Sequence, residues 1–292
     1  MKMRWMFLFL LTITIGPALA QTKGINSTLL KRATAGNPQA QFEVAQAFAL
    51  GQPVPQDFTR AATWYQKAAG QGHAQAQYEL GLLFRTGLGV SQDDVKAASW
   101  YRKAADQGVA AAQLNLGVLY DQGEGVSQDR AQAAGWFRKA ALQGVAEAQY
   151  NLGSMYERGV GVPQDHAQAA DLYRRAADNG NASAQFNLGL LYDNGTGLER
   201  NYAQAVAWYA KAAEQGLPRA QFNLGSMYAG GQGVPVNFAE AYFWLDLAAS
   251  TWNGTRQESA IQARDTVAQR LTPADLATAK DRAEKWLAEH QK

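Results

Sequence analysis

Few residues of this 292-residue chain have the types and spacing that catalysis requires. Its three histidines are His73, His166 and His290, and no two of them share a spacing suited to a metal ion. The chain contains no cysteine, so it has neither a thiolate ligand nor a cysteine nucleophile. Asp165 and His166 are adjacent in sequence, but adjacency does not orient a catalytic triad. We therefore expect no catalytic, cofactor-binding or metal-binding residues and no cofactor.

Two recurring polar or glycine patterns have a structural interpretation that is simpler than a chemical one. A Gly-x-Gly pattern recurs after segments of helical periodicity, where it ends a helix; a phosphate-binding loop would follow a strand. A short polar residue recurs before each following segment, where its side chain caps a helix and needs no acid–base role. These capping positions are Asp57, Asp93, Asp129, Asp165, Asn201 and Asn237.

These patterns return at a constant interval of 36 residues. The segment from Ala74 to Val109 is repeated from Ala110, from Ala146, from Ala182 and more loosely from Pro218, and a weaker copy begins at Pro38. Tryptophan keeps this interval at positions 64, 100, 136, 208 and 244, with Leu172 in the remaining place. A fixed period between 20 and 50 residues indicates a solenoid in which each unit stacks on its neighbours.

Each repeat predicts two helices. In the copy from Ala74 the first helix has a buried stripe formed by Ala76, Leu80, Leu83 and Phe84. Gly81 lies within this helix and predicts the close approach of a neighbouring helix, because an internal glycine costs about 1 kcal/mol. The second helix starts after its capping residue and carries the stripe Ala97, Trp100, Tyr101, Ala104 and Ala105. The short turns predict antiparallel helix pairs.

The spacing of these residues resembles the Sel1-like repeat, a relative of the tetratricopeptide repeat. The shared pattern is Ala-x-x-x-Leu-Gly-x-x-Tyr-x-x-Gly-x-Gly-Val, then Asp, then Ala-x-x-Trp-Tyr-x-Lys-Ala-Ala-x-x-Gly. The resemblance implies an all-α fold, a right-handed superhelix of antiparallel helix pairs, and an adaptor role in protein complexes, often in the bacterial envelope. Some members have a disulfide in each repeat, and this cysteine-free chain departs from them. Its first copy is the weakest, with Ala45 and Pro53 in two glycine positions.

The first twenty residues predict a cleavable signal peptide. Lys2 and Arg4 precede an apolar run from Trp5 to Ile15, and Ala18-Leu19-Ala20 has the small-x-small form of a cleavage site. We expect cleavage after Ala20 and a periplasmic or secreted protein. The run is shorter than the ~20 residues of a membrane span, so we expect no membrane insertion after cleavage. Without Lys2 and Arg4 the 27 basic residues become 25, equal to the 25 acidic ones, which argues against nucleic acid as a partner.

The repeats and their flanks predict the division of the chain. We expect a signal peptide over 1–20, an N-terminal capping segment over 21–37, six repeats over 38–253 and capping helices over 254–292. The repeats are expected at 38–73, 74–109, 110–145, 146–181, 182–217 and 218–253. Arg256 to Leu271 predicts one C-terminal helix, and Thr272 caps a second one whose residue Trp286 is expected on the last repeat.

The outward positions of the first helices form the candidate binding surface. Four amides recur in register with one carboxylate, and each amide could hydrogen-bond the backbone of an extended peptide. The alternative is that these amides bond the adjacent helix. The next ring of positions is more apolar, and charges of both signs follow at Arg85, Asp121, Glu157, Arg158 and Asp193. The candidate partner-binding residues are Glu79, Leu82, Asn115, Val118, Asn151, Ser154, Asn187, Leu190, Asn223 and Ser226.

The sequence favours a non-enzymatic scaffold that binds a protein or an extended peptide on the concave surface of the first helices. The alternative is an enzyme, or a regulator of an enzyme, that acts on peptidoglycan. The aromatic series Phe84, Tyr120, Tyr156, Tyr192 and Tyr228 would suit sugar stacking, but at this spacing it is more typical of a core. The sequence does not name the partner.

Overall fold

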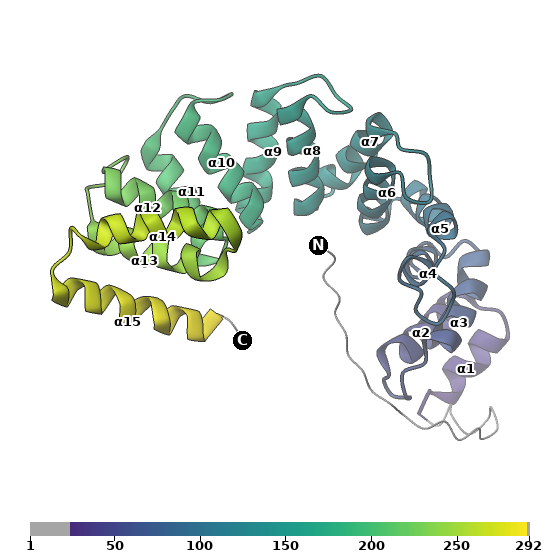
Figure 1. Cartoon of the computed structure of the whole chain (residues 1–292). Helices are drawn as coiled ribbons and strands as arrows, with labels where there is room; N and C mark the ends of the chain where they lie inside the picture. The colour runs from purple at the N-terminus through teal and green to yellow at the C-terminus, as the bar shows by residue number, and fades with distance from the viewer. Residues whose placement is uncertain (1–23, 291–292) are drawn as a thin grey trace. The chain divides into compact units, whose positions relative to one another are not determined.

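The computed structural model describes residues 24–290, and these fold into fifteen α-helices without a β-strand (Figure 1). This confirms the all-α fold class, whereas the predicted signal peptide lies outside the described residues. The helices are α1 (Ser27–Thr34), α2 (Pro38–Leu50), α3 (Phe58–Gly70), α4 (Ala74–Thr86), α5 (Asp94–Asp106), α6 (Ala110–Gln122), α7 (Arg130–Leu142), α8 (Ala146–Arg158), α9 (His166–Asp178), α10 (Ala182–Asn194), α11 (Tyr202–Glu214), α12 (Pro218–Gly230), α13 (Phe238–Thr251), α14 (Gly254–Ala268) and α15 (Pro273–His290).

The chain divides into two compact units, residues 1–104 and 105–292, and the division falls within α5. Each repeat consists of a first helix, here called helix A, and a second helix, helix B. The helices A are α2, α4, α6, α8, α10 and α12, and the helices B are α3, α5, α7, α9, α11 and α13. In the second unit each of α7, α9 and α11 packs on its own helix A and on the helix A that follows. The predicted solenoid of stacked helix pairs is thereby confirmed.

Helix ends follow the predicted signals. Helix A of the fourth repeat ends at Gly159, whose φ of 65° is left-handed and therefore favours glycine. Asp165 then caps α9, because its carboxylate accepts hydrogen bonds from the backbone N–H groups of Ala167 and Gln168, both at 3.0 Å. The first repeat also closes normally at Gly51, with φ of 70°, although Pro53 replaces its second turn glycine.

In the second, fourth, fifth and sixth repeats the second glycine of the turn lies against the preceding repeat. A Cβ on Gly161 would stand 2.3 Å from the carbonyl oxygen of Arg130, at the start of the preceding helix B. Gly197 and Gly233 meet the backbone of His166 and Tyr202 in the same way, at 2.5 and 2.4 Å. These glycines are therefore required both for their positive φ and for the contact between successive turns.

The glycine inside helix A makes room for an aromatic ring of helix B. A Cβ on Gly117 would lie 2.7 Å from ring atoms of Phe137, and one on Gly189 would lie 2.7 Å from the ring of Tyr209. Both rings are buried. The predicted close approach of a neighbouring helix is confirmed, and the group that approaches is a side chain from helix B of the same repeat.

A buried glutamine connects successive repeats. Gln149 is only 4% exposed, and its Nε2 donates to the carbonyl oxygen of Ala141 in the preceding helix B at 3.2 Å. Gln185 bonds Ala177 likewise at 3.1 Å. Because a buried carbonyl without a partner costs roughly 1–3 kcal/mol, this side chain satisfies the end of each helix B. The sequence shows the register of these glutamines but not their partners.

The helix B tryptophans lie at the edge of the core, and in four repeats a lysine lies over the tryptophan ring. Trp136 and Trp208 are buried, and the ammonium groups of Lys139 and Lys211 each lie 3.8 Å from the ring centroids. In the fourth repeat the place of the tryptophan is taken by Leu172, and a hollow of about 420 Å³ opens beside it. This hollow is mainly apolar and is also lined by Leu152 and Tyr156.

Both ends of the repeat array are covered by helices. In the first unit α1 takes the place of a preceding helix B, because Gln41 Nε2 donates to the carbonyl oxygen of Ala33 at 3.1 Å. At the other end α14 spans Gly254–Ala268, slightly displaced from the predicted Arg256–Leu271, and it packs on α13. Thr272 caps α15 as predicted, with Asp275 N–H 3.2 Å from its hydroxyl. No helix within residues 24–290 is long and apolar enough to cross a bilayer.

Candidate binding site on the helix A surface

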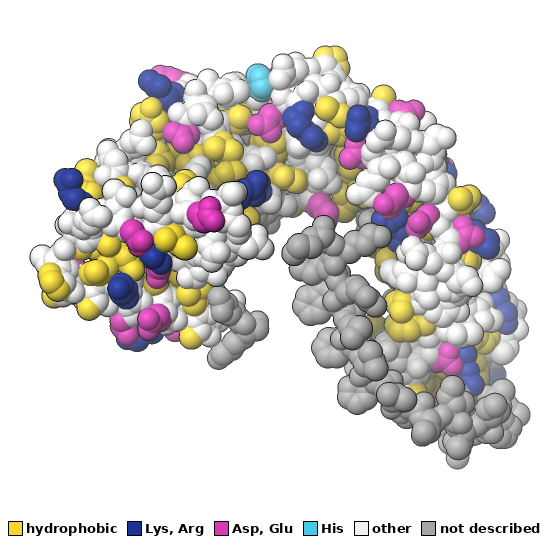
Figure 2. Space-filling view, viewed as in Figure 1, with side chains coloured by type: hydrophobic (Ala, Val, Ile, Leu, Met, Phe, Trp, Pro, Cys, Tyr) yellow, Lys and Arg dark blue, Asp and Glu magenta, His cyan; other side chains and the backbone are white. Residues whose placement is uncertain are grey.

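All ten predicted binding residues lie on helices A and are half-buried. Glu79 and Leu82 are on α4 in the first unit. The second unit carries the other eight, two on each of α6, α8, α10 and α12: Asn115, Val118, Asn151, Ser154, Asn187, Leu190, Asn223 and Ser226. On the face seen in Figure 2, positive and negative side chains are interspersed without a large patch of one sign.

Two of the four amides are engaged by tyrosine hydroxyls from helices B. Tyr173 of α9 donates to Glu157 Oε2 at 2.6 Å, and burial followed by this bond raises the pKa of its hydroxyl, while the nearby side chains of Asn187 and Ser154 lower it. Tyr209 of α11 donates to Asp193 at 3.1 Å; burial raises the pKa of its hydroxyl, and the nearby side chain of Asn223 lowers it. For Asn187 and Asn223 the structure therefore favours the alternative in which the amide holds neighbouring helices together.

The first unit shows the same arrangement around Glu79. Burial and the charge of Glu79 both raise the pKa of Tyr65, which holds the position in helix B that Tyr173 holds three repeats later. Glu79 also accepts a hydrogen bond from Gln75 Nε2 at 3.0 Å. The ring of positions proposed for binding is therefore also the ring that receives the helix B hydroxyls.

The third repeat breaks this pattern, because Phe137 occupies the tyrosine position and has no hydroxyl. The amide of Asn151, which follows in the register, has no side-chain hydrogen bond within the described residues. A hollow of about 240 Å³ opens here between α6 and α8. It brings three predicted residues together, Val118, Asn151 and Ser154, with Phe137 in its wall. We call this hollow the Phe137 groove.

Charged groups of both signs surround the Phe137 groove. Asp121 lies 3.6 Å from the guanidinium of Arg130, and Arg158 Nε donates to the carbonyl oxygen of Ser154 at 3.2 Å. Glu147 completes the rim. The groove thus offers amide, hydroxyl, carboxylate and guanidinium groups, which can bond both the N–H and the C=O groups of a peptide backbone.

Ser226 lies in a second hollow, which the sequence did not predict. This hollow has a volume of about 420 Å³, lies between α12 and α14, and is mainly apolar, with Leu245, Ala263 and Val267 in its lining. Ser226 itself donates to the carbonyl oxygen of Phe222 at 2.9 Å, so its hydroxyl is engaged locally. The periodicity ends before α14, and for that reason it could not predict that α14 forms one side of this hollow.

The remaining predicted residues have simpler surroundings. Leu190 packs against the core formed by α11, α12 and α13, whereas Asn115 and Leu82 are half-buried positions on α6 and α4. The aromatic series is largely core: Tyr120 and Tyr156 are buried, and Arg138 donates to the hydroxyl of Tyr156 at 2.9 Å. Phe137 is a residue of the candidate site that was not predicted from the sequence, although its place in a register of tyrosines is visible there.

The histidines are used structurally. His73 caps α4, with its Nδ1 accepting from Ala76 N–H at 3.1 Å, and burial lowers its pKa. His166 opens α9, and His290 stacks on Trp286 with ring centroids 3.9 Å apart. Among residues 24–290 there is no group of three or more His, Asp and Glu side chains able to hold a metal ion.

Comparison with protein families places this architecture. The Sel1 repeat matches six consecutive segments, at residues 38–73, 74–109, 110–145, 146–181, 182–217 and 218–250. The protein belongs to the Sel1 repeat family. This family has a generally non-catalytic scaffold fold that typically serves protein–protein interaction.

Solved structures agree with this assignment. The chain is similar to a protective antigen present in uropathogenic Escherichia coli strains that displays an SLR fold, with 35% identity and a TM-score of 0.78. That match covers 89% of this chain but only 56% of the antigen, so this chain spans little more than half its length. A Sel1 repeat protein from Oxalobacter formigenes is also similar, with 34% identity, a TM-score of 0.67, and coverage of 76% and 88% of the two chains. No curated protein matches this chain.

Proposed function

We propose that this protein is a non-enzymatic adaptor that binds an extended segment of a protein partner on the helix A surface of its second unit. The Phe137 groove supplies the main polar contact. The observation that supports this proposal is the amide of Asn151, which is half-buried in the groove and has no side-chain hydrogen bond within the described residues. Such an amide offers two donors and an acceptor to a ligand.

The chemistry of the groove favours an extended backbone over a helical one. An extended segment presents free N–H and C=O groups at each residue, whereas a helix has already paired these groups internally. The groove is lined mostly by polar atoms and carries both signs of charge, so it has little apolar surface on which an amphipathic helix could dock. The groups in the groove therefore fit main-chain recognition.

The decisive variant is Phe137→Tyr, which restores the residue found in this position in the neighbouring repeats. The added hydroxyl would enter the groove and reach the amide of Asn151, as the hydroxyl of Tyr173 lies near the amide of Asn187. We expect the fold to be kept and binding to weaken by at least tenfold. Asn151→Ala should weaken binding by about 2- to 12-fold, which corresponds to one net hydrogen bond of roughly 0.5–1.5 kcal/mol.

The matched control is Tyr209→Phe, which removes a hydroxyl two repeats further on, where it bonds Asp193, and leaves the residues that line the Phe137 groove unchanged. Peptides selected from a random library against residues 21–292 would provide the ligand, and calorimetry would measure their affinity for each variant. We expect Tyr209→Phe to bind as the unmodified protein does. If Phe137→Tyr and Asn151→Ala also bind with unchanged affinity, the groove is not the binding site.

We further propose that the protein acts in the periplasm or outside the cell, after cleavage following Ala20. The basic start, the apolar run and the small residues before Gln21 support this proposal. Mass spectrometry of protein recovered from its native cells should give a chain that starts at Gln21 in the periplasmic or culture fraction. A cytosolic chain that retains Lys2 and Arg4 would refute it.

A further inference from the structure

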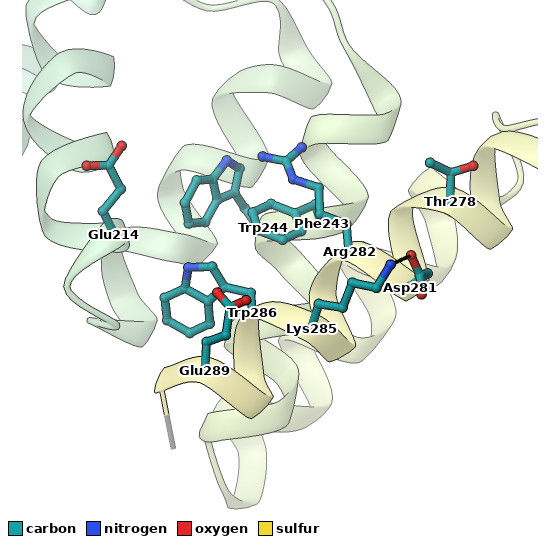
Figure 3. Close-up of a pocket in the computed structure, with 9 residues that line it drawn as sticks. All are labelled: Glu214, Phe243, Trp244, Thr278, Asp281, Arg282, Lys285, Trp286 and Glu289. Carbon is teal, nitrogen blue, oxygen red and sulfur yellow. Dashed lines mark hydrogen bonds and ion pairs between the residues drawn. The ribbon is translucent and has the colours of Figure 1, made fainter. Parts of the chain in front are cut away.

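A further pocket lies at the C-terminal end of the second unit, far from the Phe137 groove along the sequence. It has a volume of about 520 Å³ and is bounded by the end of α11, by α13 and by α15 (Figure 3). Two indole rings line it, Trp244 from α13 and Trp286 from α15, together with the carboxylates of Glu214 and Glu289. Trp286 fulfils the prediction that it packs on the end of the repeat array, because it joins the core cluster that contains Trp244.

Trp244 differs from the other helix B tryptophans because no lysine covers it. Lysines three residues later lie over the rings of Trp64, Trp100, Trp136 and Trp208, with the ammonium 4.3, 4.1, 3.8 and 3.8 Å from the ring centroids. In the sixth repeat this position is Leu247, which is fully buried beneath α15. The Trp244 indole therefore borders the pocket without the cation that its equivalents possess.

The cations within the pocket are already engaged. Arg282 pairs with Glu240 and lies over the ring of Phe243, with its Cζ 3.9 Å from the centroid. Lys285 points toward Asp281, 2.7 Å away, and away from the indoles (Figure 3). The exposed carboxylates of Glu214 and Glu289 have no ion pair within residues 24–290. The charge left for a ligand is consequently negative.

The two indoles also have a defined arrangement. His290 stacks on one face of the Trp286 ring, with 7° between the ring planes. Trp244 is held edge-on against Phe243, with ring centroids 4.7 Å apart. Both rings are therefore fixed before a ligand arrives. Fixed electron-rich rings next to unpaired carboxylates are the chemistry that recognises an organic cation.

We propose that this pocket binds an alkylammonium group, and that the group is a lysine side chain presented by a protein partner. The repeats themselves carry the precedent, since four of them place a lysine ammonium on the equivalent tryptophan ring. The unpaired Glu214 and Glu289 supply charge complementarity. A desolvated ammonium is stabilised on an aromatic face, and each nearby exposed carboxylate adds a smaller contribution.

The test uses residues 21–292 and three probes at low ionic strength. The probes are acetyl-Gly-Lys-Gly-amide, the same peptide with norleucine in place of lysine, and n-butylammonium. The indole N–H signals of Trp244 and Trp286 in ¹H–¹⁵N spectra report binding. We expect saturable shifts with the lysine peptide, and at least tenfold weaker binding of the uncharged norleucine peptide and of butylammonium.

Variants of the two carboxylates test the charge. Glu214→Gln and Glu289→Gln are exposed and should each weaken lysine-peptide binding by about 1.5- to 5-fold. Glu258→Gln, an exposed glutamate on α14 outside this pocket, should leave it unchanged. Equal binding of the norleucine peptide, or unchanged affinity in both pocket variants, would overturn the cation site. Butylammonium binding as tightly as the peptide would overturn the assignment to a partner's lysine. Phe137→Tyr should have no effect on this pocket, so the two proposals fail separately.

Discussion

Replacing Asn179 with glutamine should stabilise the second unit, because it restores a hydrogen bond that other repeats possess. At the end of helix B, Gln71, Gln143 and Gln215 donate to the buried glutamine of helix A at 2.7, 2.8 and 2.7 Å. Asn179 holds this position in the fourth repeat, but its shorter side chain donates to the carbonyl oxygen of Arg175 at 3.1 Å. Gln149 Oε1 is therefore left without a hydrogen-bond partner among the described residues.

The expected gain is about 1 kcal/mol. A net hydrogen bond contributes roughly 0.5–1.5 kcal/mol, and satisfying a buried acceptor lies at the upper end of that range. Ordering the longer glutamine side chain costs a fraction of this gain. The backbone needs no adjustment, because φ and ψ are −85° and 15° at Asn179 and −84° and 6° at Gln143.

Urea unfolding followed by circular dichroism measures the effect. With a slope of about 3 kcal/mol per molar urea, the midpoint should rise by roughly 0.3 M. The matched control is the same substitution in a Gln149→Met background, which keeps the volume but removes the acceptor, and there Asn179→Gln should give no gain. An equal gain in both backgrounds, or no gain in either, would refute the assignment of the missing bond.

Four further substitutions test the packing and the caps. Gly117→Ala should destabilise the protein by up to ~2 kcal/mol, because the added Cβ would overlap the Phe137 ring. Gly135→Ala should stabilise it by about 1 kcal/mol, because the added Cβ meets no atom within 4 Å. Changes of the same sign in the free energy of unfolding, measured with urea, would contradict this packing. Leu172→Trp should fill the hollow of the fourth repeat and add roughly 1 kcal/mol, and a lowered thermal midpoint would show that an indole does not fit. Hydrogen bonds from the backbone N–H and side chain of Gln168 lower the pKa of Asp165. The contribution of this carboxylate to folding stability is therefore present above the ordinary aspartate pKa and is lost as the pH falls toward the lowered pKa. Asp165→Asn should reduce the acid sensitivity measured by thermal melts between pH 6 and 3, and an unchanged pH profile would argue against the cap.

The fold was predictable because the residues that end the helices and form their buried faces act locally, within each repeat. Gly159 and Asp165 each act within a few residues of their own position, so a periodic sequence is enough to place them. The core alanines and Leu152 follow from helical spacing in the same way. What the sequence could not give were the connections between repeats, such as the hydrogen bond from Gln149 Nε2 to the carbonyl oxygen of Ala141 in the preceding helix B.

The candidate site was predictable in outline but not in detail, for the same reason. The register identified Asn151 and Asn187 as equivalent positions. These two positions differ in whether a hydroxyl from the preceding helix B reaches the amide. The sequence does not reveal this difference, because it does not show that the tyrosine ring passes over Gly153 or its equivalent toward the next helix A. Once the path of the tyrosine ring is known, the sequence shows that the third repeat, with Phe137 in the tyrosine position, supplies no hydroxyl to the amide of Asn151. The C-terminal pocket could not be predicted from the repeat pattern, because α15 lies outside the repeats and has no equivalent in them.

The second turn glycines also determine how a protein of this kind can change its length. Because Gly161 leaves no space between its own turn and the backbone of Arg130, a residue inserted there would push neighbouring repeats apart along their whole interface. A block of 36 residues, by contrast, brings its own glycine and its own docking backbone. Duplication or deletion of complete 36-residue repeats should therefore be tolerated where small insertions are not. The length of such a repeat array can consequently change only by whole repeats.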